Sequence, residues 1–378
     1  MKNPFQYGGV VTGDAFCNRV QELNDLMRAM ENSDKLFVYS ERRFGKTSLI
    51  RQTFEKLPQQ EFVKAYVDLW PTDAETSFVT TVAKSIAESM STTTDKLLET
   101  AKTPFSRLSP TVTVDDEGKP RMTFGINKDF DLEIELEQVL SVPAKLADKS
   151  KKNVVVVFDE FQQILEYGND TVERRLRSII QNQIDVSYIF LGSRKHLIQK
   201  MFLDKSRPLY RAGGHYPIGP IAVKHWFPFL KKKFLDSDRL IQDTQIQKIC
   251  ELTEGHPFYT QHLRHALWEL CEPATPVTEE MINSALDILL ERESYAYTNL
   301  WESLAKNQRR FLKGLASEPV GVKPFAADFV SRFELGSASN AQRAAEALLE
   351  KDVIDRENAS FVIVDRFFRI WIQKTHLV

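Results

Sequence analysis

The chain has 378 residues, and its 50 Lys and Arg against 52 Asp and Glu give a formal charge of −2. A chain of this length holds two or three domains with ample core, and its balanced charge excludes a global field for polyanions. Three widely spaced cysteines without a C-x-x-C pair indicate a reducing compartment and no zinc site. With no apolar signal segment or membrane-length stretch, the sequence predicts a cytoplasmic protein without membrane contact.

The N-terminal part contains one predicted helix. Residues 1–15 look irregular, and residues 16–23 open an amphipathic helix that continues to about residue 30. We therefore expect a short N-terminal segment, residues 1–13, ahead of the first domain.

A strand, a turn and a helix follow in the order that a phosphate-binding loop requires. Residues 36–39 form an apolar run typical of a buried strand, and Gly45-Lys46-Thr47 comes directly after it. Gly45 lets the backbone approach phosphate oxygens, which the free amides of the new helix attract. Lys46 can reach the β- and γ-phosphates, and the Thr47 hydroxyl can ligate Mg²⁺.

This loop departs from the consensus G-x-x-x-x-G-K-[ST] at one position, where Ser40 replaces the first glycine. Serine tolerates a positive φ less freely than glycine, so we expect a slightly remodelled loop. A chance Gly-Lys-Thr in a basic turn is the alternative. The residues predicted to bind the nucleotide here are Ser40, Arg42, Arg43, Phe44, Gly45, Lys46, Thr47 and Ser48.

The next segments predict more of the sheet and an insertion. Residues 62–69 read as a second strand and residues 76–90 as a helix, with a loop at 91–94. Two alternating segments, 111–114 and 121–124, flank the acidic turn Asp115-Asp116-Glu117-Gly118 and predict a β-hairpin. We expect an insertion over about residues 94–130, followed by a helix at 132–147.

A continuous apolar run at residues 154–158 ends in Asp159 and Glu160. Such a run suits a central parallel strand covered on both faces. Asp159 then lies where a P-loop fold needs an acid for Mg²⁺, and Glu160 is placed to polarise a water for attack on the γ-phosphate. A buried strand followed by solvated acids is the alternative.

Residues 186–191 form another buried strand, which ends in Gly192-Ser193-Arg194. In the P-loop layout this strand lies beside the strand of Asp159, so its end faces the γ-phosphate. The Ser193 hydroxyl or the Arg194 guanidinium could sense that phosphate. A surface-paired arginine is the alternative.

The C-terminal part reads as two helical regions. A lid begins near residues 226–229 and continues with helices at 240–252 and 259–271, and residues 277–280 cap the next helix. Helices at 300–315, 324–332 and 341–350 and a hairpin over 352–364, with Asn358 at its turn, predict a winged helix.

Four motifs of the sequence belong together. They are Phe-x-x-Arg-x-x-Glu-Leu at 16–23, Arg-Arg-x-Gly-Lys-Thr-Ser-Leu at 42–49, Phe-Asp-Glu-Phe-Gln at 158–162 and the aromatic segment 365–371. This set resembles the archaeal-type ATPases of the STAND group, AAA+-related P-loop NTPases that also occur in bacteria. The resemblance implies that Arg19 contacts the nucleotide, although the family usually has glycine where this chain has Asn18. It also implies that Pro257 packs near the base, that Ser193 and Arg194 sense the γ-phosphate, and that the nucleotide is ATP.

We thus expect an α/β P-loop core of the AAA+-like type (14–218), a helical lid (219–296) and a winged helix (297–378). The predicted function is an ATP-binding, Mg²⁺-dependent ATPase that acts as a conformational switch. ATP would hold lid and winged helix against the core, and water activated at Glu160 would hydrolyse it and release them. Turnover is expected to be slow or to depend on a protein partner or self-association.

Two other functions compete with this one. A DNA-binding ATPase resembling origin-recognition initiators would share the core and winged helix. However, residues 297–378 carry 12 basic and 10 acidic residues, and the third helix offers one arginine against two glutamates, so a protein contact is favoured over DNA. A module that holds nucleotide with little turnover is the other alternative, because Ser40 departs from the loop consensus.

Overall fold

The computed structural model describes residues 3–90, 105, 108–114, 120–126, 129–319, 321–357 and 360–377. The chain forms two compact units. The first, called the sheet unit, contains Val20–Ser40 and Leu49–Ile218. The second, called the helical unit, contains Met1–Arg19, Glu41–Ser48 and Gly219–Val378, so the phosphate-binding loop belongs to it.

A five-stranded parallel sheet organises the sheet unit, in the order β2-β5-β6-β1-β7. The predicted strands are all present, as β1 (Lys35–Tyr39), β2 (Phe62–Asp68), β5 (Asn153–Asp159) and β6 (Val186–Gly192). The sequence does not predict the edge strand β7 (Gly214–Pro217), because four residues with glycine at one end and proline at the other carry little strand signal. The predicted α/β fold class is confirmed.

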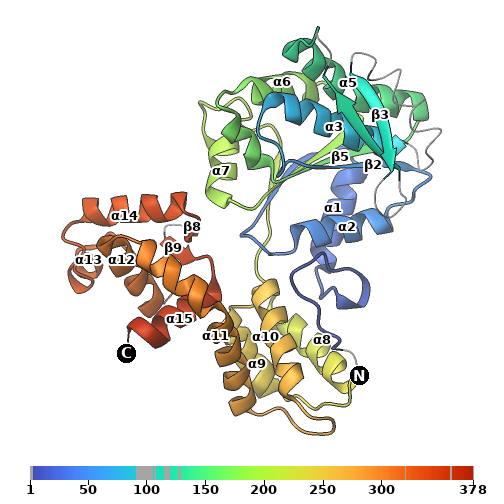
Figure 1. Ribbon diagram of the computed structural model, residues 1–378. Helices are drawn as coiled ribbons and strands as arrows, with labels where there is room; N and C mark the ends of the chain where they lie inside the picture. Colours follow the sequence, from blue (N-terminus) through green and yellow to red (C-terminus); the bar gives the residue numbers. More distant parts are fainter. Residues whose placement is uncertain are drawn as a thin grey trace. The chain divides into compact units, whose positions relative to one another are not determined.

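The sheet is buried on both faces, as the continuous apolar run of β5 predicts. Val154, Val156 and Phe158 join the core that includes residues of α3 (Glu75–Met90) and α5 (Leu132–Ser150). The alternate residues Val155 and Val157 are equally buried and turn to the opposite face. Figure 1 shows α3 and α5 on one side of the sheet and α1 (Val20–Glu31) and α2 (Lys46–Lys56) on the other.

Three further helices complete the main body of the sheet unit: the 3₁₀ helix η2 (Phe161–Tyr167), α6 (Thr171–Ile180) and α7 (Lys195–Leu203). Beside the sheet, β3 (Ser109–Val114) and β4 (Pro120–Gly125) form an antiparallel pair, which confirms the predicted hairpin. Its turn at Asp115-Asp116-Glu117-Gly118 lies outside the described residues, as does the loop predicted at 91–94. Much of the predicted insertion at 94–130 is likewise not described.

The helical unit begins with η1 (Gly13–Ala15) in the N-terminal segment and then contains α8 (Val223–Leu235), α9 (Asp243–Thr253), α10 (Pro257–Leu270) and the long α11 (Glu279–Ser303). The Thr278 side chain caps α11 by accepting a hydrogen bond from the Met281 amide at 3.3 Å, as the sequence predicts. The winged helix follows with α12 (Lys306–Ser317), α13 (Ala327–Arg332) and α14 (Ala338–Glu350). The antiparallel pair β8 (Ile354–Glu357) and β9 (Ser360–Ile363) and the helix α15 (Arg366–His376) complete it, while Asn358 lies outside the described residues.

Two helix predictions are corrected. The helix expected at 300–315 is divided, because α11 ends at Ser303 and Leu304 and Ala305 have extended conformations before α12. The first helix begins at Val20 rather than at residue 16, since Asn18 and Arg19 have positive φ values of 56° and 66°. Helical periodicity therefore starts in the sequence before the backbone adopts it.

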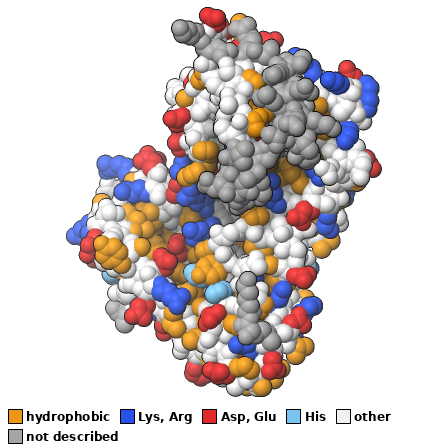
Figure 2. Space-filling view, turned by 45° about the vertical axis from the view of Figure 1, so that its right-hand side comes forward, with side chains coloured by type: hydrophobic (Ala, Val, Ile, Leu, Met, Phe, Trp, Pro, Cys, Tyr) orange, Lys and Arg blue, Asp and Glu red, His pale blue; other side chains and the backbone are white. Residues whose placement is uncertain are grey.

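One continuous hydrophobic core runs through α8–α15 of the helical unit. Aromatic pairs contribute to it, with ring centroids 4.9 Å apart for Tyr259 and Phe367 and 5.2 Å apart for Tyr297 and Phe368. Because lid helices and winged helix share this core, they pack as one body. Among the described residues, no helix is both long and apolar enough to cross a bilayer. Figure 2 shows basic, acidic and hydrophobic side chains interspersed over the face in view.

Candidate functional site

The loop between β1 and α2 has the backbone of a phosphate-binding turn. Gly45 has a φ of +83°, in the region where glycine is least strained, and α2 starts at the next residue. The first amides of α2 therefore lie immediately after the glycine and lack partners within the helix, which suits an anion. Ser40 does not adopt a left-handed conformation, so the serine that replaces the consensus glycine carries no positive-φ strain.

Lys46 and Thr47 open α2 and present the two side chains that the sequence assigns to phosphate and metal. The Lys46 ammonium is buried and donates a hydrogen bond to the Glu41 carbonyl oxygen at 3.1 Å. Its side chain thus folds back over the loop. Ser48 has a different contact, because its hydroxyl oxygen accepts a hydrogen bond from the Val11 amide at 2.9 Å.

Arginines and an aromatic side chain of the predicted site hold the loop to the rest of the helical unit. The Arg19 guanidinium donates to the Phe44 carbonyl oxygen at 3.4 Å and so lies at the loop, while its contact with the nucleotide stays a prediction. The Arg43 guanidinium lies 4.3 Å from the ring centroid of Phe258, within cation–π range. The Arg42 side chain is exposed.

His256 brings the start of α10 to the loop, and Pro257 is the buried first residue of that helix. His256 is 1% exposed, and its ring lies edge-on to Phe44 at 4.3 Å. Its Nδ1 accepts a hydrogen bond from the Phe258 amide at 3.2 Å, which leaves the proton on Nε2. Burial, and then repulsion by Arg366, lower its pKa well below the ordinary value, against a hydrogen bond with the Arg42 backbone. His256 is therefore a neutral histidine that joins lid and loop.

The loop carboxylate of Glu41 forms a buried ion pair that the sequence does not predict. Arg366, the first residue of α15, places one guanidinium nitrogen 2.8 Å from a Glu41 carboxylate oxygen. Its Nε lies 2.7 Å from a carboxylate oxygen of Glu254, which also pairs with Arg369. Burial opposes the charge of Arg366, but the two carboxylates outweigh it and raise its pKa.

The acids that follow β5 form a second cluster, in the sheet unit. Asp159 ends the strand, and its carboxylate accepts hydrogen bonds from the Tyr66 hydroxyl and, at 2.8 Å, from the Glu160 amide. Glu160 itself has a φ of 50°, which turns the chain sharply out of the strand. The two carboxylates accordingly have different hydrogen-bond partners, Tyr66 for Asp159 and Ser193 and Gln162 for Glu160.

Glu160 is held by side chains from two elements. The Ser193 hydroxyl donates to its carboxylate at 2.6 Å, and the Gln162 amide donates to the same oxygen. Ser193 reaches it because β5 and β6 are parallel neighbours, so their carboxyl ends meet at one edge of the sheet. Arg194 lies beside this pair in the chain but forms an ion pair with Glu166 at 3.5 Å.

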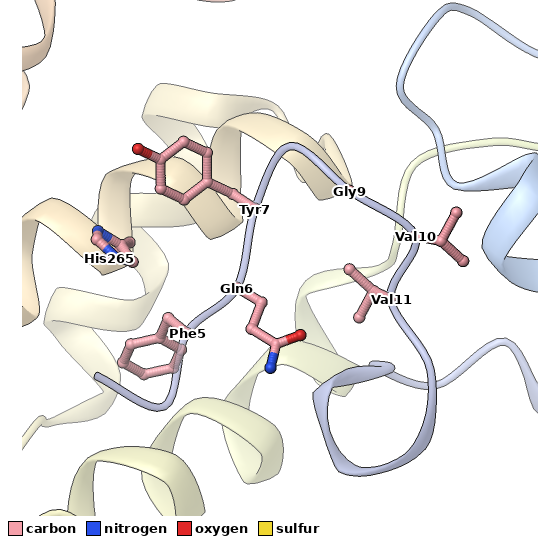
Figure 3. Close-up of a pocket in the computed structure, with 7 residues that line it drawn as sticks. All are labelled: Phe5, Gln6, Tyr7, Gly9, Val10, Val11 and His265. Carbon is pink, nitrogen blue, oxygen red and sulfur yellow. The ribbon is translucent and has the colours of Figure 1, made fainter. Parts of the chain in front are cut away.

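A pocket of about 330 Å³ lies along the N-terminal segment of the helical unit. In Figure 3, Phe5, Tyr7 and His265 lie toward one end of its lining and Val10 and Val11 toward the other. The Tyr7 ring stacks on His262 of α10, with centroids 4.1 Å apart. Because Val11 is also bonded to Ser48, this pocket adjoins the first turn of α2.

Sequence reasoning missed several residues of these clusters. Tyr66 lies on the predicted strand β2, and Gln162 follows Glu160 by two residues in the motif at 158–162, which offered only a weak signal. Glu41 and Arg366 offered none, because ion pairs between distant parts of a chain leave no local pattern. The Phe5–Val11 pocket wall lies in a segment that the sequence shows only as irregular.

The parallel sheet with acids at the end of β5 and the Gly-Lys-Thr loop that opens α2 define a P-loop NTPase, and the last elements add a winged helix. Residues 16–263 match the family described as "ATPase domain predominantly from Archaea", and residues 295–374 match "Probable winged helix domain". The chain therefore belongs to this family of ATPase domains. None of the curated proteins matches the sequence significantly.

Solved structures share the fold over nearly the whole chain. The Walker-type ATPase of Pyrococcus abyssi is similar with a TM-score of 0.64 and 16% identity, covering 95% of this chain and 97% of that one. The ORC2 protein of Aeropyrum pernix, in its ADPNP-ADP complexes, has a TM-score of 0.54 and 13% identity, covering 95% of each chain. At these identities the likeness concerns the fold.

Proposed function

We propose that the protein is an ATP-binding, Mg²⁺-dependent ATPase that works as a conformational switch of the STAND type. The observation that carries the proposal is the Glu160 carboxylate held by Ser193 at the edge of the sheet where β1 leads into the Gly-Lys-Thr loop. A loop of this kind alone would bind phosphate; the positioned carboxylate adds a base for hydrolysis.

The loop residues fit a triphosphate. The amides that open α2 and the Lys46 ammonium supply positive charge, and Lys46 would exchange the Glu41 carbonyl for a phosphate oxygen. The pocket along Phe5–Val11 is of a size suited to a nucleobase and borders the loop through Val11 and Ser48. We place the adenine there, with Pro257 near the base and Arg19 in contact with the nucleotide, as the family resemblance implies.

The oxygen donors of Thr47 and Asp159 are those that Mg²⁺ prefers, and Asp159 is held by Tyr66 and the Glu160 amide in a fixed orientation. These two residues would hold the ion, which supplies charge neutralisation at the β- and γ-phosphates. Glu160 would take a proton from water as the water oxygen bonds to the γ-phosphorus. The bond from that phosphorus to the bridging oxygen breaks, giving ADP and phosphate.

The switch follows from the contacts of the loop and of Glu160. In the helical unit, the loop is touched by the lid through His256 and by the winged helix through Arg366. Ser193 would sense the γ-phosphate by sharing its hydroxyl between that phosphate and Glu160, and Arg194 would add charge on leaving Glu166. Loss of the γ-phosphate would then change the contacts of Ser193 and Arg194. The lid and the winged helix would be released toward a protein partner.

The winged helix favours a protein contact over DNA. The exposed charged side chains on α14 include Arg343, Glu346 and Glu350. The Arg343 guanidinium donates a hydrogen bond to the Asn340 side chain. A helix with so little free positive charge neutralises few phosphates. DNA binding therefore remains the second partner to test and not the favoured one.

The test is steady-state phosphate release from ATP and Mg²⁺ by wild type and by Glu160→Gln, with and without duplex DNA. We expect slow wild-type turnover that DNA leaves unchanged and that the variant loses while it still binds ATP. Wild-type turnover in Glu160→Gln would remove Glu160 as the base, and stimulation by DNA would favour the DNA-binding alternative. ATP binding without any turnover would favour the nucleotide-holding module.

A further inference from the structure

Glu41 places a buried carboxylate inside the loop that is proposed to receive a triphosphate. Its side chain is 2% exposed, and its backbone carbonyl anchors the Lys46 ammonium at 3.1 Å. A negative charge there repels the phosphates that the loop is built to attract, and burial reduces the screening by water. Something must compensate this charge for the loop to bind an anion well.

The winged helix provides the compensation through Arg366. The guanidinium is 6% exposed and lies 2.8 Å from the Glu41 carboxylate. The same guanidinium nitrogen also donates to the Ile363 carbonyl oxygen at 2.9 Å, while Nε faces Glu254. One guanidinium nitrogen thus faces Glu41 and the Nε faces Glu254, and these two carboxylates compensate the burial of the positive charge.

The position of Arg366 is fixed by the start of α15. The Asp365 carboxylate accepts hydrogen bonds from the amides of Phe367 and Phe368 at 2.9 and 3.0 Å and so caps the helix. The rings of Phe367 and Phe368 are buried in the core of the helical unit. Arg366 therefore reaches the loop only while the winged helix is packed on the lid.

We propose that Arg366 is a positioning residue of the nucleotide loop, which neutralises Glu41 and thereby makes tight triphosphate binding depend on the docked winged helix. This inference rests on the proposed ATP-binding function. By linkage, a triphosphate in the loop strengthens the docking of the winged helix by the same factor that docking strengthens its binding. Glu41 is thus the group through which occupancy of the loop reaches the C-terminal domain.

A purely structural ion pair would behave differently toward ligands of different charge. If Arg366 only stabilised the fold, its loss would weaken the binding of every ligand equally or not at all. If it compensates Glu41, its loss uncovers a negative charge, and the penalty grows with the number of phosphates on the ligand. The series ATP, ADP and adenosine therefore separates the two roles.

The experiment measures the Kd of ATP, ADP and adenosine by calorimetry, with Mg²⁺, for the full-length wild type, Arg366→Gln, Glu41→Gln and the double variant. For Arg366→Gln we expect ATP binding to weaken roughly tenfold or more, ADP binding less, and adenosine binding within about threefold of wild type. The double variant, which removes both charges, should return ATP binding to within about threefold of wild type.

Arg369→Gln is the matched control, because Arg369 lies on the same helix and pairs with the same Glu254 but has no ion pair with the loop. It should bind ATP within about threefold of wild type. Thermal unfolding of each variant shows how much of any change reflects folding. If Arg366→Gln does not fold, Glu41→Gln still tests the proposal, since it should bind ATP at least as tightly as wild type.

Equal losses for ATP and adenosine in Arg366→Gln, or unchanged ATP binding, would overturn the role of Arg366. So would a double variant as weak as Arg366→Gln, or weaker ATP binding by Glu41→Gln. A wild type that binds none of the ligands would instead refute the proposed function itself.

Discussion

At the scale of single residues, two buried or partly buried carboxylates are held by side chains in a similar way. Glu160 receives two side-chain donors, from Ser193 and Gln162, and Glu41 receives one guanidinium. In both clusters a carboxylate near the proposed phosphate path is held by a donor from a different element. Hydrogen bonds to charged groups are among the stronger ones in proteins, so these contacts fix direction as well as charge.

Lys46→Ala should remove most ATP binding. The variant loses the ammonium that would contact the phosphates, and we expect a Kd roughly a hundredfold higher, or about 3 kcal/mol. Calorimetry with ATP and Mg²⁺ measures it. Lys56→Ala, at the exposed end of the same helix α2, is the control and should bind as wild type; unchanged binding by Lys46→Ala would refute the site.

Ser193→Ala should lower kcat and leave ATP binding nearly unchanged. The Ser193 hydroxyl donates to the Glu160 carboxylate at 2.6 Å, and losing a hydrogen bond to a charged group costs about 1.5–3 kcal/mol, a kcat roughly tenfold to a hundredfold lower. Phosphate release at saturating ATP measures the change. Ser206→Ala, whose hydroxyl bonds the exposed Asp204, serves as the control, and a wild-type kcat in Ser193→Ala would contradict the assignment.

At the scale of elements, the winged helix depends on close approach of two helices. Gly314 on α12 lies against α13 and the residue after it, so that a Cβ at this position would lie 2.4 Å from the Phe329 ring and 2.8 Å from the Phe333 ring. Both rings belong to the packed interior of this domain or border it. The glycine is therefore required by packing, since its own helical conformation accepts any side chain.

Gly314→Ala should destabilise the protein despite the better helix propensity of alanine. Overpacking costs about 1–3 kcal/mol and the propensity gain returns up to about 1 kcal/mol, so we expect a net loss of about 1–2 kcal/mol. Urea unfolding followed by circular dichroism measures it. Ser317→Ala, exposed on the same helix, should change stability little, and a more stable Gly314→Ala would show that the two rings move aside freely.

At the scale of the whole molecule, buried groups of the two units, His256 and His262 in the helical unit and Glu173 in the sheet unit, should respond to acid in opposite directions. In the helical unit, burial is the main cause that lowers the pKa of His256 well below 6.5 and that of His262 to about 4. In the sheet unit, burial raises the pKa of Glu173 to about 7 against the attraction of Arg207. Burial thus favours the neutral form of both histidines in the helical unit. It likewise favours the protonated, neutral form of Glu173 in the sheet unit.

The signs follow from proton linkage. Below pH 6.5 these histidines bind protons in the unfolded chain but not in the folded one. The helical unit should therefore lose stability as the pH falls from 6.5 toward 4. Folded Glu173 binds its proton near pH 7, whereas the unfolded side chain binds it near 4.5. The contribution of Glu173 to the stability of the sheet unit should therefore increase as the pH falls over the same range.

Hydrogen exchange of backbone amides at pH 7 and pH 5, corrected for intrinsic rates, resolves the two units. Protection should fall in α10 and its neighbours at pH 5 and should be kept or rise around α6. His262→Gln should reduce the loss in the helical unit, and Glu173→Gln should remove the gain in the sheet unit. Equal loss of protection in both units would contradict the assignment of these groups.

Parts of the fold that depend on local chemistry were predictable from the sequence. The apolar run of β5 predicted a strand buried on both faces, and Gly45 before Lys46 predicted a tight turn that opens a helix. The winged-helix order of helices and hairpin was predictable for the same reason, since each element carries its own period and caps. Asp159, Glu160 and Ser193 were proposed as site residues because they end or follow predicted parallel strands, whose carboxyl ends share an edge.

The tertiary structure decided what depends on distant partners. The Arg366–Glu41 pair, the hydrogen bonds that hold Glu160 and the pocket along Phe5–Val11 join segments far apart in the chain, and no periodicity encodes such contacts. The start of α1 at Val20, the break before α12 and the short strand β7 were also not predictable, because local preference at these positions is weak. Local pattern reveals which residues could act, and only the fold shows which of them meet.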